Sequence, residues 1–210
     1  MSRNYLKQKK ATRSEKIFQK FCVEKKIDCK RLDEPHTLFL RKQILKDPAG
    51  KCPDFICLKG SEKIFVEVKT LTNFTNAARE KRIEQKIVEA FDLIPELKGP
   101  LRNFLKDASN KFKNIKEECD CPGVMYLDGV FGAPETIPVV YAGVCHTYVK
   151  VGGELKYVGR TKTQRSLFDE RGSHVSAIVW YNDEKKRFEC LENSKARVKL
   201  TEGIFSFFFG

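Results

Sequence analysis

The chain has 210 residues, of which 41% are hydrophobic, and its 40 Lys and Arg against 28 Asp and Glu give a formal net charge of +12. A chain of this length buries a substantial core and seldom needs a second domain, so we expect one domain over residues 1–210. No apolar run reaches the length of a membrane span and residues 1–4 open no signal peptide, which predicts a soluble, cytoplasmic protein without membrane contact. The positive charge predicts a polyanionic partner such as nucleic acid.

Most of the eight cysteines are scattered singly through apolar segments. Neither Cys119 with Cys121 nor Cys145 with His146 has the CxxC or paired histidine spacing of a zinc site. We therefore expect free thiols that pack as small hydrophobic side chains in a reducing compartment.

The N-terminal segment is predicted to form an arm followed by a helix. Residues 1–11 are polar and basic, as in a mobile basic arm. A helix is expected from Thr12, because Thr12 and Glu15 have the spacing of a capping box. Its apolar stripe consists of Ile17, Phe18, Phe21 and Cys22.

Two short strands are expected after this helix. Residues 27–32 and 37–44 have the apolar content of strands, and the turn-forming residues 33–36 separate them. Residues 47–50 predict another turn, after which a hairpin begins.

The stretch from Pro53 to Lys69 predicts this hairpin. A Gly-Ser pair at 60–61 separates two β-rich runs, and glycine supplies the positive φ angle that the first central position of such a turn needs. Counting outward places Asp54 directly opposite Glu67, with Cβ atoms roughly 4.5–5.5 Å apart. Lys69 projects to the same face as Glu67, because side chains alternate along a strand. The other face is apolar and carries Phe55, Cys57, Ile64, Val66 and Val68.

Two carboxylates opposed in this way repel each other unless something offsets their charge. One acid could bind a proton, because a neighbouring negative charge raises a carboxyl pKa, or a hard divalent cation could lie between them. We favour the cation. The alternative is a solvent-facing acid and base, Glu67 and Lys69, on an edge strand, with Asp54 as a turn residue after Pro53.

These residues resemble the signature of the PD-(D/E)XK nuclease superfamily. The chain has Pro53-Asp54, then twelve residues, then Glu67-Val68-Lys69. The resemblance implies metal-dependent hydrolysis of phosphodiester bonds in DNA, preferably double-stranded, with Mg²⁺ or Mn²⁺. It also implies that Asp54 and Glu67 bind the metal with the Val68 carbonyl as a third oxygen, and that Lys69 stabilises charge or orients the attacking water.

The resemblance suggests two further site residues. Related nucleases often carry an acid on their first helix, and Glu15 is the candidate, although the capping box explains it equally well. They also often carry a polar residue on the helix after the lysine strand. A helix is expected over residues 76–94, because Ile83, Ile87, Ala90 and Ile94 share a face. Pro95 is expected to end this helix. Gln85 is the candidate for the polar site residue on it.

Basic side chains on this helix could follow the DNA backbone, although a solvated basic face explains them as well. They are Arg79, Arg82 and Lys86. The loop at residues 159–165 is basic and rich in hydroxyl groups, so it is either a phosphate clamp or a plain exposed loop. Its basic residues are Arg160, Lys162 and Arg165.

The rest of the chain adds a second helix and several strands. Residues 101–119 have a helical stripe of Leu101, Phe104, Leu105, Ala108, Phe112 and Ile115, with basic residues elsewhere. Residues 124–127 and 173–181 predict interior strands, and 187–191 an outer hairpin arm. Residues 129–172 form a β-rich insertion or extension, with strands expected at 137–144, 147–151 and 154–158.

The order of elements predicts an α/β fold with a restriction-endonuclease-like core over residues 12–128, in which helices flank a mixed central β-sheet, plus a β-rich C-terminal extension. The C-terminal segment 203–210 is rich in phenylalanine, so it must pack on the domain or on a partner subunit. A homodimer would suit a nuclease that cuts both strands. The expected function is an endonuclease of restriction, mobile-element or repair type. The alternatives are an inactive DNA-binding module on the same scaffold and a basic protein-interaction or assembly factor.

Overall fold

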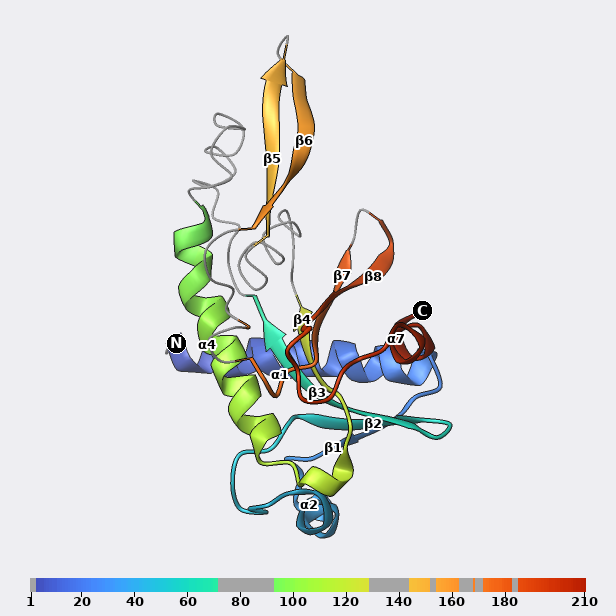
Figure 1. Cartoon of the computed structure of the whole chain (residues 1–210). Helices are drawn as coiled ribbons and strands as arrows, with labels where there is room; N and C mark the ends of the chain where they lie inside the picture. The colour runs from blue at the N-terminus through green and yellow to red at the C-terminus, as the bar shows by residue number, and fades with distance from the viewer. Residues whose placement is uncertain are drawn as a thin grey trace.

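A computed structural model describes residues 3–71, 93–128, 144–151, 154–162, 168, 172–182 and 185–210. Its centre is a six-stranded sheet in the order β1-β2-β3-β4-β7-β8 (Figure 1). These strands are β1 (Asp28–Arg31), β2 (Phe55–Lys59), β3 (Glu62–Thr70), β4 (Gly123–Asp128), β7 (Ala177–Asn182) and β8 (Arg187–Glu192). The prediction of a mixed α/β fold with a central mixed sheet flanked by helices is confirmed.

The strand directions place two hairpins at the edges of a parallel centre. β1, β2 and β3 pair antiparallel, β3, β4 and β7 pair parallel, and β8 returns antiparallel to β7. The predicted strand at 124–127 is therefore an interior strand, and the arm at 187–191 is the outer strand. The strand expected at 173–181 is also interior, but it begins at Ala177, so residues 173–176 of this prediction are wrong. Because β7 and β8 belong to the central sheet, the C-terminal part of the chain completes the core, and residues 129–172 are an insertion between β4 and β7.

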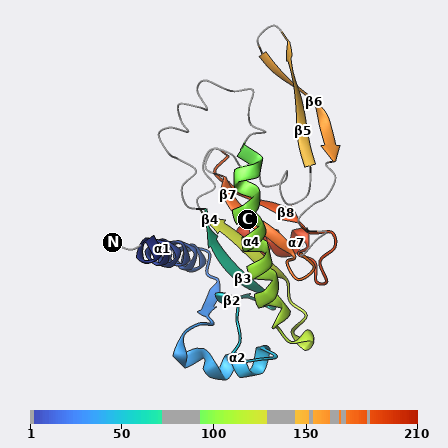
Figure 2. The same ribbon diagram turned by 90° about the vertical axis from the view of Figure 1, so that its left-hand side faces the viewer.

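Helices cover both faces of the sheet, with α1 and α4 on opposite sides (Figure 2). The helices are α1 (Arg3–Glu24), α2 (Leu38–Ile44), α4 (Leu93–Lys113) and α7 (Glu202–Phe209), with short 3-10 turns η1 (Pro35–Thr37) and η3 (Glu117–Cys119). Within the described ranges, no helix combines the length and the apolar character that crossing a bilayer requires.

The alternation of side chains along the strands divides the core into two layers. On the face toward α4, Ile56 and Phe65 pack with helix residues such as Leu105. On the face toward α1 and α7, the buried residues are the five apolar hairpin residues predicted to share that face, together with residues from the helices and neighbouring strands: Phe18, Cys22, Phe55, Cys57, Ile64, Val66, Val68, Val124, Tyr126, Ala177, Val179, Phe208 and Phe209.

The predicted hairpin has the expected register. Leu58 pairs with Lys63, Ile56 pairs with Phe65, and the strands are joined at Gly60, whose φ angle is +58°. A side chain at this φ angle is strained, so glycine explains why the turn forms at this position. The turn then determines which residues of β2 and β3 face each other.

The N-terminal prediction is wrong in part. α1 begins at Arg3, so residues 3–11 belong to the helix, and the expected start and capping box at Thr12 are not present. Lysine and glutamine are good helix formers, so the basic composition of this segment is compatible with a helix. The stripe is also narrower than expected, because Phe18 and Cys22 are buried whereas Ile17 is 42% exposed.

The strand predicted over residues 37–44 is a helix, α2. Its burial follows a helical period, with Thr37 and Ile44 buried and Leu40 partly buried, while Phe39 is exposed. Pro35 opens the preceding 3-10 turn, because its fixed φ angle suits the first position of a helix. The apolar content of this short segment therefore did not distinguish strand from helix.

Pro95 does not end a helix, and this prediction is wrong. α4 runs from Leu93 to Lys113 and includes both Pro95 and Pro100. Pro95 lies in the first turn, where no N–H group is needed for an intrahelical bond. The expected stripe of 101–119 is buried at Leu101, Leu105, Ala108 and Phe112, although the helix ends at Lys113.

A second sheet consists of β5 (Val144–Val151) and β6 (Glu154–Lys162), which form an antiparallel hairpin and project away from the central sheet (Figure 1). The turn expected at 152–153, and residues 137–143 of another expected strand, lie outside the described residues. The prediction of a basic loop over residues 159–165 is wrong for residues 159–162, because these residues pair in β6 with residues 144–147.

The phenylalanine-rich C-terminus packs on the domain itself. It forms α7, which begins at Thr201, whose side chain caps the helix by accepting a hydrogen bond from the Ile204 N–H. Phe208 and Phe209 are buried, and the Phe209 ring stacks on Phe21 of α1 with centroids 5.9 Å apart. Packing on the domain thus buries two phenylalanine side chains of the C-terminal segment, for which the sequence alone did not identify a packing partner.

Candidate active site

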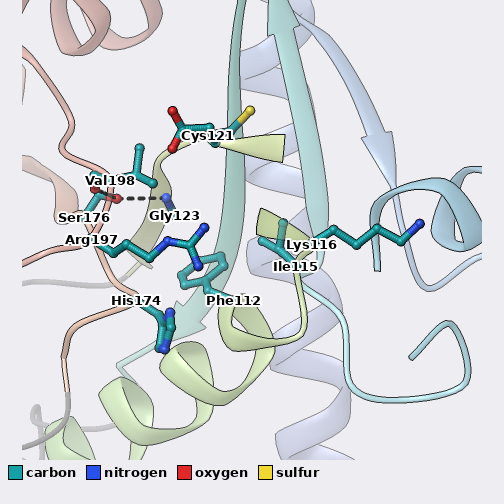
Figure 3. A pocket seen from close by; sticks show the side chains of 10 residues that line it. Phe112, Ile115, Lys116, Cys121, Gly123, His174, Ser176, Arg197 and Val198 are labelled. Carbon is teal, nitrogen blue, oxygen red and sulfur yellow. Dashed lines mark hydrogen bonds between the residues drawn. The ribbon is translucent and has the colours of Figure 1, made fainter. Parts of the chain in front are cut away.

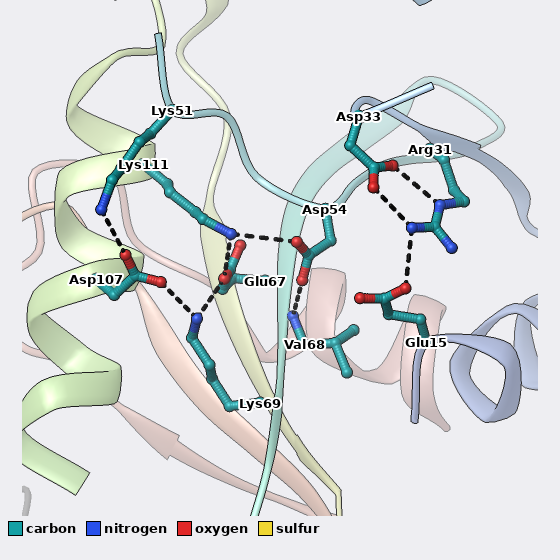
Figure 4. A network of polar contacts seen from close by, with 10 residues as sticks. All are labelled: Glu15, Arg31, Asp33, Lys51, Asp54, Glu67, Val68, Lys69, Asp107 and Lys111. Atoms are coloured by element: carbon teal, nitrogen blue, oxygen red, sulfur yellow. Dashed lines mark hydrogen bonds and ion pairs between the residues drawn. The ribbon is translucent and has the colours of Figure 1, made fainter. Parts of the chain in front are cut away.

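Asp54 and Glu67 lie together beside the start of β2. Asp54 immediately precedes β2, and Glu67 lies in the second half of β3. The register that pairs Phe55 with Val66 places Asp54 opposite Glu67. Asp54 Oδ2 accepts a hydrogen bond of 2.8 Å from the backbone N–H of Val68 (Figure 4). The structure thus brings together the two acids that the hairpin register predicted.

The backbone of Val68 contributes its polar groups to the same side. In an antiparallel pair, the N–H and C=O groups of one residue point toward the same neighbouring strand. Since the Val68 N–H points to Asp54, its carbonyl oxygen also faces this edge of β3. Its role as a third oxygen ligand stays a prediction.

Lys69 lies beside Glu67, on the face that the strand alternation predicted. Its Nζ atom is 2.6 Å from Glu67 Oε1 and 2.6 Å from Asp107 Oδ2. β3 is an interior strand and Glu67 is fully buried, so the alternative of an exposed acid and base on an edge strand is wrong. A buried charged group needs such partners to remain ionised.

Helix α4 supplies two site residues that sequence reasoning missed. Asp107 also pairs with Lys51, and Lys111 Nζ lies 2.6 Å from Glu67 Oε1 and 3.2 Å from Asp54 Oδ1. In the sequence, Lys111 is one of the basic residues outside the apolar stripe of this helix, and no site role was predicted for it. The two residues are four apart, so they share one face of α4, and their position beside the buried Ala108 and Phe112 was the signal available in the sequence.

Glu67 has the most perturbed carboxyl group of the site. Burial, followed by the charge of Asp54, raises its pKa from 4.5 to about 7, although Lys69 and Lys111 oppose this shift. Near neutral pH the site therefore accepts a proton or another positive charge at Glu67 readily.

The two lysines remain protonated in this setting. Burial alone would lower the pKa of Lys69, but Glu67 and Asp107 outweigh it and the pKa is raised. The pKa of Lys111 is raised for the same reason, with Glu67 and Asp54 outweighing burial. A protonated Lys69 can donate hydrogen bonds and stabilise negative charge, and it is poorly suited to take a proton from water.

One oxygen of Glu67 lacks a partner. Oε2 is buried, and among the described residues no group donates a hydrogen bond to it. A buried carboxylate oxygen without a partner is destabilising, and such atoms often mark the position of an ion or a water molecule. The oxygen atoms of this site that could bind a metal belong to carboxylate and carbonyl groups, which hard divalent cations prefer as ligands. The residues therefore fit Mg²⁺ or Mn²⁺.

Glu15 lies near the site on α1, on the other side of Asp54 from Lys111 (Figure 4). Its carboxylate pairs with Arg31 at 2.9 Å, and Arg31 also binds Asp33. Burial raises the pKa of Glu15 and the negative charge of Asp54 adds to the shift, while Arg31 lowers it. The Glu15 carboxylate is therefore close enough to interact electrostatically with Asp54. The capping box does not explain Glu15, because α1 begins at Arg3.

A chain of hydroxyl groups holds α1 against the sheet next to Glu15. Ser14 Oγ donates a 2.5 Å hydrogen bond to Asp128 Oδ2, and Thr70 Oγ1 donates one of 2.6 Å to Ser14 Oγ. Asp128 and Thr70 end neighbouring parallel strands, and both lie at the carboxyl ends where polar side chains meet. These contacts position the middle of α1 relative to the acids.

The remaining predicted residues are not placed at the site. Gln85, Arg79, Arg82, Lys86 and Arg165 lie outside the described residues. Arg160 and Lys162 lie in β6, in the hairpin that projects from the domain.

A small pocket in the described part of the chain lies away from these residues. It has a volume of about 30 Å³ and is lined near the start of β4 by Phe112, Gly123, His174 and Arg197, among others (Figure 3). This space is enough for water and too small for a nucleotide. None of the acids or lysines of the network described above lines it.

Comparison of the chain with protein-family models, with curated proteins and with solved structures finds no match in any of the three.

Proposed function

We propose that the chain is a metal-dependent deoxyribonuclease with a restriction-endonuclease-like core, which hydrolyses phosphodiester bonds in double-stranded DNA. The observation that carries this proposal is the buried Glu67, which lies opposite Asp54, contacts Lys69 through Oε1, and has no partner for Oε2 among the described residues. An acid pair with one free oxygen and a protonated amine is suited to bind a cation and a phosphate together.

Asp54, Glu67 and the Val68 carbonyl would hold Mg²⁺ or Mn²⁺. A divalent cation at this position supplies Lewis acidity toward a phosphate oxygen and lowers the pKa of a bound water. The opposed acids would then no longer repel each other, because the doubly positive charge offsets both.

The side chains of the chain have separate roles in this proposal. Lys69 donates hydrogen bonds to a phosphate oxygen and stabilises the negative charge that develops there. Asp107 is a positioning residue, since its 2.6 Å contact holds the Lys69 amine beside Glu67. Glu15 would orient the attacking water from the α1 side, after exchanging its contact with Arg31.

The net charge of +12 supports DNA as the partner, because phosphate neutralisation gives affinity that falls with salt. Backbone contacts are assigned to Arg79, Arg82, Lys86, Arg160, Lys162 and Arg165. A homodimer would place two sites across a duplex. The seven described cysteines are free thiols, which supports a reducing, cytoplasmic setting.

One observation favours a second candidate, a DNA-binding module without catalysis. The Lys111 ammonium contacts both Asp54 and Glu67, so it already offsets the charge that a divalent cation would offset. In a nuclease, this ammonium must move aside when the cation binds, whereas in a module it would remain.

Lys69→Ala tests the proposal. Plasmid DNA incubated with Mg²⁺ or Mn²⁺ is expected to be cleaved by the parent protein, and the variant should lose cleavage by on the order of a hundredfold or more, since one electrostatic donor to a transition state has this effect. Gel analysis of nicked and linear DNA over time measures the rates.

Lys63→Ala is the matched control. Lys63 lies on the same strand and the same face as Lys69, six positions earlier and away from the acids. It should retain the parent rate. A parent protein that binds DNA with a normal salt dependence and cleaves nothing in either metal would support the module and contradict the nuclease.

A further inference from the structure

Three cysteine sulfurs converge on the face of the sheet opposite the acids. Cys22 lies in the last turns of α1, Cys29 in β1 and Cys57 in β2. Cys29 and Cys57 are direct partners in the antiparallel pair, and α1 packs over the same face. All three Sγ atoms lie within 4.8 Å of one another, and those of Cys29 and Cys57 are 3.5 Å apart.

We propose that Cys22, Cys29 and Cys57 form a binding site for Zn²⁺, with all three sulfurs as ligands. Zinc is held by thiolates at about 2.3 Å, so three sulfurs on one tetrahedral ion lie roughly 3.8 Å apart. The Cys29–Cys57 separation of 3.5 Å is close to this value and the other two are at most 4.8 Å, so small side-chain rotations would reach it. Water would complete the coordination from the side of Cys29, the half-buried member of the set.

The three thiols influence one another's protonation. Hydrogen bonds from Cys22 and then Cys57 lower the pKa of Cys29. The pKa of Cys57 is raised by burial, and that of Cys22 is raised chiefly by its hydrogen bond with Cys29. Because zinc binds thiolates, Zn²⁺ would displace the protons that the thiols carry.

The position of the cluster points to a structural role for the ion. Cys29 and Cys57 come from two strands that pair through their backbones, and Cys22 comes from the helix that packs on them, so coordination would join α1 to β1 and β2. Glu15 lies on the same helix, and its placement beside Asp54 depends on this packing. A ligand that binds only the folded state also raises the free energy of unfolding, by an amount that grows with the logarithm of the ligand concentration divided by Kd.

Cadmium titration of the metal-free protein under anaerobic conditions with a non-thiol reductant tests the site. Cd²⁺ is the probe because thiolate coordination produces an ultraviolet charge-transfer band, whereas carboxylate coordination at Asp54 and Glu67 does not. We expect saturation at one ion, displacement by Zn²⁺, and release of protons on binding near neutral pH.

Cys29→Ser should reduce the affinity by roughly a hundredfold and weaken the band, and Cys190→Ser should change neither. Cys190 is a suitable control because it packs against the same core layer from β8, outside the cluster. Cys29→Ala replaces the serine variant if circular dichroism shows the latter to be unfolded. Absence of a stoichiometric band in the parent protein, or a band that Cys29 variants retain in full, would overturn the site.

Discussion

Asp54→Asn and Glu67→Gln should each slow metal-dependent DNA cleavage by roughly a thousandfold or more. The proposed cation contributes several kcal/mol to the stabilisation of transition-state charge, and each loss of about 1.4 kcal/mol slows the reaction tenfold. An amide has the shape of the carboxyl group and lacks its charge, so the loss would come from weakened cation binding. Single-turnover rates on plasmid DNA at saturating Mg²⁺ measure the effect.

Glu62→Gln provides the control for this pair of variants. Glu62 begins the same strand as Glu67 and pairs with Lys59 beside the turn, far along the strand from Asp54. The variant should cleave at the parent rate. If Asp54→Asn and Glu67→Gln also cleaved at the parent rate, the two acids would have no part in catalysis.

The same Glu67→Gln substitution should stabilise the metal-free protein at pH 8 by about 3 kcal/mol. Burial raises the pKa of Glu67 from 4.5 to about 7, and each pKa unit corresponds to about 1.4 kcal/mol. The ionised side chain is therefore less stable in the fold than in the unfolded chain. Glutamine removes this charge and keeps the volume of the buried side chain.

The sign of the pH dependence follows from the raised pKa. Between about pH 4.5 and pH 7 the folded state binds more protons at Glu67 than the unfolded state, so this contribution to stability is lost as the pH rises through that window. Urea unfolding of both proteins in a chelator at pH 5 and pH 8 measures it. The difference between the two proteins should grow with pH, since contributions of other groups cancel. A difference that is constant with pH would show that Glu67 titrates normally.

The hairpin of the candidate site could be predicted because its interactions are local in the sequence. Gly60 determines the turn, the turn determines the register, and the period of two places Asp54, Glu67 and Lys69 on one face. The buried faces of the longer elements were predictable for the same reason, since periodicity depends only on neighbouring positions. The helical stripe from Leu101 to Phe112 is an example.

The contribution of α4 to the site could not be predicted in this way. Asp107 contacts Lys69, and Lys111 contacts both acids, through tertiary packing across a sequence separation of 38 or more residues. On the sequence they resemble any charged pair at the border of an amphipathic helix. Their role appears only when the helix is placed over β3.

Local signals that compete with packing produced the wrong element boundaries. Pro95 was expected to end a helix, but a proline in the first turn is compatible with one. The segment at 37–44 is too short for its period to be read reliably, and tertiary burial of Ile44 decides its structure. The cysteine cluster could not be predicted, because the three residues do not have the spacing of a known metal-binding motif. Their sulfur atoms meet because β1 pairs with β2 and α1 packs on the same face.

Calorimetric titration with Mn²⁺ tests the central claim most directly, namely that a divalent cation binds between Asp54 and Glu67. The Cys29→Ser background keeps the thiol cluster from contributing. We expect uptake by the protein with both acids intact, strongly reduced uptake in Asp54→Asn and in Glu67→Gln, and unchanged uptake in Glu62→Gln. Equal uptake in all of these proteins, or none in any of them, would contradict the claim.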